Sequence, residues 1–240
     1  MTRWAFPVDR GSSFGSQMRT STLMRSCSEL KTVYGTLTNA VRPSVSEDPT
    51  LSTQQRLVVA ISGASGVIYG VRTLERLREL GIETHLVMTR AAKITLSHET
   101  DLKVADVEAL ASVVHPADDV GASISSGSFR TLGMIVAPCS IRSLSEIASG
   151  VTSGLLARAA DVVLKERRRL VLLVREAPLH AGHLKTMLAA TEMGAIIVPP
   201  VPAFYFRPTS LDEVIDQTVA RSIDLFGLEA HGIQRWEGSR

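Results

Sequence analysis

Short apolar runs alternate with amphipathic segments from about residue 57 onward. Five runs have the length and composition of buried strands: 57–61, 83–88, 133–137, 170–174 and 195–198. Helical spacing of apolar residues predicts helices at 67–80, 91–98, 103–111, 141–149, 155–166, 180–193 and 211–226. Strands that alternate with helices form right-handed crossovers, which predicts a single α/β domain. We expect a three-layer, doubly wound, mostly parallel sheet of the Rossmann-like or flavodoxin-like kind.

The N-terminal region has a different composition. Up to Ser46 it contains six basic and two acidic residues, many serines and threonines, and no strong hydrophobic period. This composition is typical of a mitochondrial presequence, of a disordered tail, or of a start codon assigned too far upstream. We therefore expect a disordered or targeting extension at 1–54, a ligand-binding domain at 55–227 and a tail at 228–240.

Composition excludes few functions but narrows the classes. The chain is 45% hydrophobic and 21% charged, with a net charge of +2 and no sustained basic stripe, so we expect no nucleic-acid partner. The two cysteines, Cys27 and Cys139, make a poor disulfide candidate and suggest a reducing compartment. Because no apolar run approaches the roughly 20 residues of a membrane helix, we expect no membrane partner.

Candidate site residues follow the predicted strands. In doubly wound sheets, ligands bind beyond the carboxyl ends of the strands. Small, hydroxyl-bearing, cationic and acidic residues follow the strands at 63–66 (Gly-Ala-Ser-Gly), 89–90 (Thr-Arg), 140–143 (Ser-Ile-Arg-Ser), 175–176 (Arg-Glu) and 199–205. This placement predicts a polar pocket at that edge of the sheet.

Two of these segments are helix starts suited to an anion. Backbone amides and the positive helix end at 63–66 and 140–143 could bind a phosphate. An ordinary tight turn explains 63–66 equally simply, and a serine N-cap is the default interpretation of 140–143. The segment 125–128 (Ser-Ser-Gly-Ser) could be a third anion nest or a surface turn. The motif G-x-G-x-x-G is missing and no acidic residue ends the second strand, which disfavours NAD and leaves a mononucleotide open.

Charged residues near the predicted pocket have alternative interpretations. Arg175 and Glu176 follow an apolar strand, and they could form a structural salt bridge or an acid–base pair near a phosphate. His180 and His183 lie one helical turn apart without a third metal ligand, so we favour a solvated or capping role. Since no aspartate-rich motif for magnesium pyrophosphate is present, we expect no metal, and any phosphate would be held by cations and hydroxyls.

Eight ordered stretches between residues 57 and 238 resemble the UbiX-type flavin prenyltransferases, a family related to fungal phenylacrylic acid decarboxylase-associated proteins. They are 61–66 (ISGASG), 83–88 (ETHLVM), 123–129 (SISSGSF), 138–144 (PCSIRSL), 158–162 (RAADV), 175–180 (REAPLH), 199–205 (PPVPAFY) and 235–238 (RWEG). Thr89 stands where serine is usual, Ser143 where threonine is frequent, and Arg221 where some members have lysine. Each departure keeps the hydroxyl or the charge, although arginine and lysine differ in geometry.

The resemblance implies an activity and a set of roles. Such enzymes join the dimethylallyl group of dimethylallyl monophosphate to N5 and C6 of reduced FMN without a metal, and the prenylated FMN serves a UbiD-type decarboxylase. Carried over to this chain, the residues that hold FMN would be Gly63, Ala64, Ser65, Thr89, Ser140, Ile141, Arg142, Ser143 and Arg175. The prenyl phosphate would be held by Tyr205 and Arg221, assisted by Lys165 and Glu99. Glu176 would transfer a proton, Ser65 would assist catalysis, and Trp236 would close over the site.

The resemblance also implies a large homo-oligomer, a dodecamer with shared sites, and a cytoplasmic location. A mitochondrial location is the alternative if 1–54 is a transit peptide. The rival functions are a flavin-dependent cysteine-type decarboxylase, whose substrate-clamp loop is expected to be rich in asparagine and methionine, and a non-catalytic flavin carrier. The segment 199–205 lacks that composition, which favours the prenyltransferase.

Overall fold

The structure, a computed structural model, describes residues 54–230, 233–236 and 238. The chain divides into two units, 1–51 and 52–240, and every described residue belongs to the second. The extension predicted at 1–54 therefore lies outside the described residues except for its last position. Its role and the domain boundaries stay predictions.

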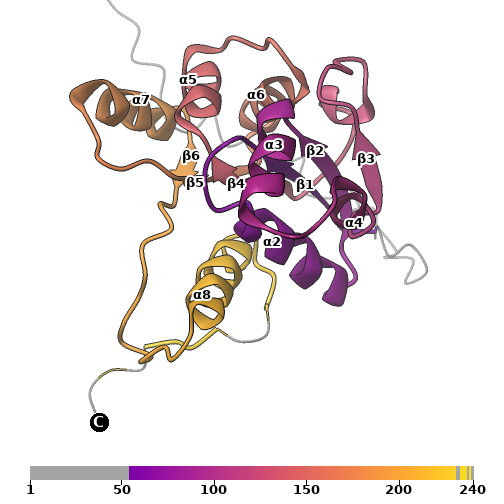
Figure 1. Ribbon diagram of the computed structural model, residues 1–240. Coiled ribbons are helices and arrows are strands. Elements are labelled where there is room, and N and C mark those ends of the chain that lie inside the picture. The colour runs from indigo at the N-terminus through magenta and orange to yellow at the C-terminus, as the bar shows by residue number, and fades with distance from the viewer. Residues whose placement is uncertain (1–53, 231–232, 237, 239–240) are drawn as a thin grey trace, which may run out of the picture. The chain divides into compact units, whose positions relative to one another are not determined.

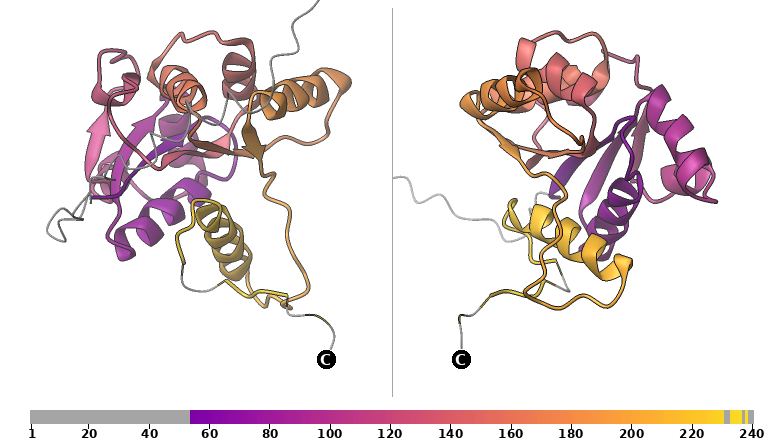
Figure 2. Two further views of the ribbon diagram at one scale, coloured as in Figure 1. Left: turned by 180° about the vertical axis from the view of Figure 1, so that it is seen from behind. Right: turned by 60° about the vertical axis from the view of Figure 1, so that its left-hand side comes forward.

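The described part of the chain is built on one six-stranded sheet (Figures 1 and 2). The strands are β1 (Arg56–Ile61), β2 (Glu83–Met88), β3 (Val113–His115), β4 (Gly133–Cys139), β5 (Arg169–Val174) and β6 (Ala195–Ile197). Their order is β3-β2-β1-β4-β5-β6, and all five pairings are parallel. The strand order reverses between β1 and β4, which is where a doubly wound sheet opens a crevice for a ligand. The predicted fold class is confirmed.

Helices cover both faces of the sheet: in Figure 1, α5, α6 and α7 lie above it and α2 and α8 lie below it. One face is covered by α2 (Ile68–Glu79), α3 (Arg90–Glu99), α4 (Val104–Glu108) and α8 (Leu211–Asp224). The other face is covered by α5 (Ile141–Ser149) and α6 (Leu155–Lys165), with α7 (Ala181–Glu192) beside α5 and a short 3-10 helix, η1 (Ser123–Ser125), beside α6. Each face has its own buried core, which completes a three-layer sandwich.

The alternation of β1 shows how the sequence supplies both cores. Leu57, Val59 and Ile61 face the α2 side, whereas Val58 and Ala60 face the α6 side. All five are buried, so the strand is apolar throughout, as expected for a parallel strand covered on both faces.

Two elements differ from the sequence-based prediction. Strand β3 was not predicted, because it has three residues at the sheet edge and Val113 and Val114 are exposed. Helix α4 is shorter than the predicted 103–111, since it ends at Glu108. Among the described helices, none combines the length and apolarity that crossing a bilayer requires.

Candidate active site

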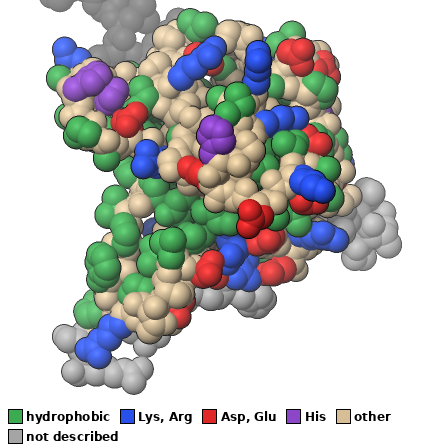
Figure 3. Space-filling model, viewed as in Figure 1, with side chains coloured by type: hydrophobic (Ala, Val, Ile, Leu, Met, Phe, Trp, Pro, Cys, Tyr) green, Lys and Arg blue, Asp and Glu red, His purple; other side chains and the backbone are tan. Residues whose placement is uncertain are grey.

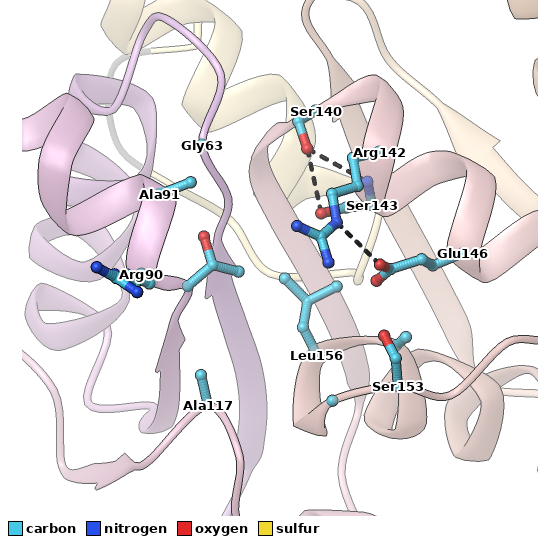
Figure 4. Close-up of a pocket in the computed structure, with 13 residues that line it drawn as sticks. Gly63, Arg90, Ala91, Ala117, Ser140, Arg142, Ser143, Glu146, Ser153 and Leu156 are labelled. Atoms are coloured by element: carbon cyan, nitrogen blue, oxygen red, sulfur yellow. Dashed lines mark hydrogen bonds and ion pairs between the residues drawn. The ribbon is translucent and has the colours of Figure 1, made fainter.

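A cavity of about 330 Å³ opens at the carboxyl ends of β1, β2 and β4 (Figure 4). One wall comes from the loop after β1 and the start of α3, and the opposite wall from the start of α5; the first turn of α6 lies between them. The lining residues are Gly63, Thr89, Arg90, Ala91, Ala117, Ser140, Arg142, Ser143, Glu146, Ser153, Gly154, Leu156 and Ala157. The structure therefore brings together the predicted segments at 63, 89 and 140–143.

The α3 wall presents a capped helix start. The Thr89 hydroxyl accepts a hydrogen bond from the Ala92 amide at 3.1 Å, and the Thr89 amide donates to the Ile61 carbonyl at 3.0 Å. A side chain at Gly63 would place its Cβ 2.3 Å from the Cβ of Ala91. Only glycine lets the β1 loop pack this closely against α3.

The α5 wall presents a second capped start. The Ser140 hydroxyl accepts a hydrogen bond from the Ser143 amide at 3.2 Å, which confirms the N-cap interpretation of this serine. The amides of Ile141 and Arg142 belong to the first turn, where a helix supplies no acceptor of its own. Ser143 is buried, whereas the Arg142 side chain is 85% exposed and pairs with Glu146 at 3.0 Å. A serine N-cap and an anion site are compatible here.

A second group of predicted residues lies beside the start of α2. The Glu99 carboxylate, at the end of α3, accepts hydrogen bonds from the amides of Gly66 at 2.8 Å and Val67 at 3.0 Å. A second cavity of about 280 Å³ is lined there by Ser65, Gly66, Ile68, Tyr69, Arg175, Pro200, Leu211 and Ile215. Of the amides at 63–66 that were expected to bind a phosphate, that of Gly66 is thus already bound by a carboxylate.

The environment of Glu99 stabilises its charged form. Partial burial raises the pKa of Glu99, but hydrogen bonds from the Ser65 hydroxyl and the two amides, together with the charge of Arg175, lower the pKa below its ordinary value of 4.5. Ser65, Glu99 and Arg175 therefore form one electrostatic group, which we call the Ser65–Glu99–Arg175 group. Sequence spacing carried no signal for this pairing, because Glu99 lies 33 positions after Gly66.

Glu176 is exposed, whereas partial burial is the usual environment of a carboxylate that acts as a general acid or base. Arg175 and Glu176 are both exposed, and no ion pair joins them in the described structure. The Glu176 carboxylate instead accepts a hydrogen bond from the Ala177 amide at 3.1 Å. Strand β5 ends at Val174, so Arg175 and Glu176 lie beyond the carboxyl end of the strand and not within the sheet.

Tyr205 and Trp236 form a third group, along α8. Gln217 is buried, and its side-chain amide donates to the Tyr205 hydroxyl at 2.9 Å and to the Gln234 carbonyl at 3.0 Å, while its oxygen accepts from the Gln234 amide at 3.0 Å. Tyr205 contacts the Trp236 ring edge-to-face, with 6.0 Å between ring centroids. Gln217 therefore fastens the tail to the segment between β6 and α8, where Figure 3 shows exposed apolar side chains gathered.

Arg221 and Lys165 lie apart from the Ser65–Glu99–Arg175 group. Arg221 pairs with Asp224 at 2.5 Å and is about 15 Å along α8 from Leu211, at about 1.5 Å per residue. Lys165 ends α6 and pairs with Glu166; it lies about 12 Å along the helix axis from Ala157, which lines the first cavity. Among the residues described, no hydrogen bond or ion pair links Arg221, Lys165 or Tyr205 to that group.

Two of the sequence motifs have structural roles in the described part of the chain. The His180 ring caps α7 by accepting a hydrogen bond from the Gly182 amide at 3.0 Å. The segment at 125–128 is a turn whose Ser126 and Ser128 hydroxyls bond each other, and the guanidinium of Arg168 donates to the Gly127 carbonyl within it and to the Phe129 carbonyl after it. That turn packs on Lys165 and Glu166, at the end of α6 remote from the cavity.

Comparison with known proteins gives the family. Residues 45–221 match the Flavoprotein family. The flavin prenyltransferase UbiX of Escherichia coli K12 is 62% identical over 188 residues, which cover 77% of this chain and all of that protein. The chain belongs to the UbiX flavin prenyltransferases.

Solved structures agree with the family. A crystal structure of AnUbiX in complex with FMN and dimethylallyl pyrophosphate has 50% identity and a TM-score of 0.77, covering 78% of this chain and 100% of the other. A dodecameric FMN-dependent UbiX-like decarboxylase from Escherichia coli O157:H7 has 51% identity and a TM-score of 0.75, covering 77% and 100%. PPC decarboxylase, at 18% identity, shares the fold alone.

Replacing Glu99 by glutamine should cost stability only where the carboxylate is charged. Because the folded-state pKa of Glu99 is lowered, its stabilisation is complete above the ordinary value of 4.5 and is lost as pH falls through the lowered value. We expect E99Q to reduce the free energy of unfolding by about 1 kcal/mol at neutral pH, and the difference from wild type to vanish in acid. Urea denaturation at a series of pH values measures both.

The control for this variant is E79Q. Glu79 is at the other end of α2, is exposed and meets no free amides, so its replacement should leave stability nearly unchanged. A deficit of E99Q that is the same at all pH values would contradict the electrostatic explanation.

Replacing Gln217 by leucine should release the tail without unfolding the domain. The variant loses three hydrogen bonds that fasten Tyr205 and Gln234, so local opening becomes more frequent. We expect trypsin to cleave after Arg235 about tenfold faster than in wild type, for a lost closing energy of about 1.4 kcal/mol. T218V, one residue further along the same helix, is the control; equal cleavage of Q217L and T218V would sink the idea.

Proposed function

We propose that this enzyme joins the dimethylallyl group of dimethylallyl monophosphate to N5 and C6 of reduced FMN. The observation that carries the proposal is the cavity between the capped starts of α3 and α5, next to the Ser65–Glu99–Arg175 group, in a member of the UbiX family. The prenylated FMN would then serve a UbiD-type decarboxylase. A cytoplasmic location stays a prediction.

The donor set of the first cavity suits FMN. First-turn amides at Ile141 and Arg142, the capping hydroxyls of Thr89 and Ser140, and the partial positive charge of two helix starts favour a phosphate. Leu156 and Ala157 supply an apolar wall for a flat ring, and the cavity of about 330 Å³ lies in the range of ligand pockets. Bound reduced FMN would supply an electron-rich ring able to attack an allylic carbon.

The prenyl phosphate would lie at the second cavity. Arg175 and Ser65, which the family resemblance assigns to FMN, line this cavity and would therefore also face the prenyl phosphate. Glu99 binds the amides of Gly66 and Val67, which directs the anion to side chains rather than to the start of α2. Cations that stabilise the departing phosphate lower the barrier for breaking the carbon–oxygen bond. Within one chain, Arg175 is the cation of this cavity.

Lys165, Tyr205 and Arg221 would reach the phosphate from other subunits. The fold of one chain keeps Lys165 at the far end of α6 and Arg221 in the last turn of α8. Exposed apolar residues along the same region, such as Val201 at 72% and Phe204 at 73%, favour burial against further copies. We therefore propose a homo-oligomer with shared sites, a dodecamer as described for the Escherichia coli O157:H7 relative.

Glu176 and Trp236 complete the proposed chemistry. Ring closure at C6 releases an aromatic proton, and an exposed carboxylate beside Arg175 can accept it and pass it to the departing phosphate. The exposed face of the Trp236 ring can stabilise positive charge on the allyl group. An oligomer that covers Glu176 would place this carboxylate in a drier setting than a single chain does.

A cysteine-type decarboxylase and a flavin carrier are the alternatives. The segment 199–205 has the composition PPVPAFY rather than one rich in asparagine and methionine, which supports the prenyltransferase over the decarboxylase. A carrier would need the flavin cavity but not the Ser65–Glu99–Arg175 group beside it.

Product mass tests the function directly. Wild type incubated anaerobically with reduced FMN and dimethylallyl monophosphate should yield a flavin heavier by one prenyl unit. We expect E176Q to form that product about a hundredfold or more slowly, because a proton acceptor is lost. Mass spectrometry and stopped-flow absorbance measure product and rate.

Further arms separate the alternatives. Dimethylallyl pyrophosphate with and without Mg²⁺ shows whether the donor is the monophosphate. A cysteine peptide that loses carbon dioxide would identify a decarboxylase, and binding of FMN without any product would identify a carrier. Wild-type rates in E176Q would remove Glu176 from the proposed role.

Mixing two inactive variants should restore activity if sites are shared. S65A and K165A would each lack one residue of every site, and co-assembly of equal amounts should leave about one quarter of the sites intact when the two residues come from different subunits. Product formation by co-expressed, doubly tagged oligomers measures the recovery. The matched control mixes S65A with R175A, two residues that one chain brings together, and should show none. Equal recovery in both mixtures, or in neither, would exclude sharing through Lys165.

A further inference from the structure

Ser62 is a buried residue that links two walls of the first cavity. It follows the last residue of β1, precedes Gly63, and is 0% exposed. Its hydroxyl donates to the Pro138 carbonyl at 2.9 Å and accepts from the Ser140 amide at 2.7 Å. Gly63 and Ser140 line opposite walls of the cavity in Figure 4, so one hydroxyl spans the base of the gap between them.

The Ser62 hydroxyl is needed because the regular pairing of β1 with β4 ends before the strands reach the cavity. The regular β1–β4 pairing runs from Val58 with Met134 to Ala60 with Val136, and β4 is irregular between Val136 and Cys139. The neighbouring junctions use backbone alone: the Thr89 amide donates to Ile61, and the Arg175 amide donates to Cys139. At β1–β4 the Ser62 amide also donates to Pro138, at 3.2 Å, but only the Ser62 hydroxyl satisfies the amide of Ser140.

The Ser62 side chain therefore acts on the site through its hydrogen bond from the Ser140 amide. This amide belongs to the N-cap residue of α5, whose first turn forms the cavity wall. Without an acceptor, this half-buried amide must find water or move, and the start of α5 would move with it. The hydroxyl takes part in no contact with the cavity itself, since Ser62 is fully buried beneath it.

We propose that Ser62 is a positioning residue that sets the spacing between Gly63 and the start of α5 and thereby the affinity for the flavin phosphate. The inference rests on the proposed function for the identity of the ligand. Because Ser62 acts through Ser140 and touches neither ligand, its loss should weaken FMN binding more than it slows the reaction of bound FMN.

The test compares four variants by FMN titration, through quenching of flavin fluorescence, and by thermal unfolding of the apoprotein. We expect the Kd for FMN to rise about tenfold in S62A and S62C, because alanine has no acceptor and a thiol is a weak one. S62T keeps the hydroxyl and should stay within about twofold of wild type. The matched control is S222A: Ser222 is also 0% exposed, and its hydroxyl bonds a backbone carbonyl at 2.8 Å in α8, away from the cavity.

The results distinguish a failure of the positioning role of Ser62 from a failure of the proposed function. The inference is supported if S62A and S222A lose similar thermal stability but only S62A loses affinity, with kcat at saturating reduced FMN within about twofold of wild type. It fails if S62A and S62C bind FMN like wild type, or if S222A weakens binding equally. Wild type that binds FMN but forms no product overturns the transferase and leaves the affinity comparison decisive. Wild type that binds no FMN overturns both.

Discussion

The parallel pairing of all six strands is the constraint on which the site depends. Parallel strands end at one edge, and every helix that follows a strand starts there with unsatisfied amides. The fold therefore concentrates hydrogen-bond donors and partial positive charge at a single edge before any functional side chain is considered. Function depends on how the chain satisfies some of these donors and leaves others free.

The first-turn amides of the three helices that start at this edge have different hydrogen-bond acceptors. At α2, the carboxylate of Glu99 takes the amides of Gly66 and Val67, so negative charge is built in. At α3 and α5, the hydroxyls of Thr89 and Ser140 each satisfy one amide and add no charge. The two neutral starts flank the first cavity, and the acidic start borders the second. The first cavity therefore suits the phosphate of a bound flavin. The second, where Arg175 lies beside a built-in carboxylate, suits the prenyl phosphate, which must leave after the reaction.

The sequence was sufficient for the layers and for the residues that follow strands, because both depend on local patterns. Apolar runs such as 57–61 identify buried strands, and Thr89 and Ser140 stand at positions that chain order alone assigns to the ligand edge. The exposed edge strand β3 lacks that pattern and was missed. Glu99 was expected to assist a prenyl phosphate through the family resemblance, but its binding to the α2 amides depends on where α3 ends in space. The roles of Ser62 and Gln217 depend on contacts 76–78 and 12–17 positions away, which no local pattern encodes.

Helix direction explains why a single chain divides the predicted site residues. In a doubly wound fold a helix that starts at the ligand edge runs back toward the opposite edge, so residues in its last turn are carried away from the ligand. Lys165 and Arg221 are both last-turn residues, in α6 and α8. If they bind the same phosphate as Arg175, the helix ends of one subunit must meet the strand ends of another. The fold then makes oligomerisation a condition for completing the site, and the segment at 199–205, with Val201 and Phe204 exposed, is a surface through which such contact would bury nonpolar area.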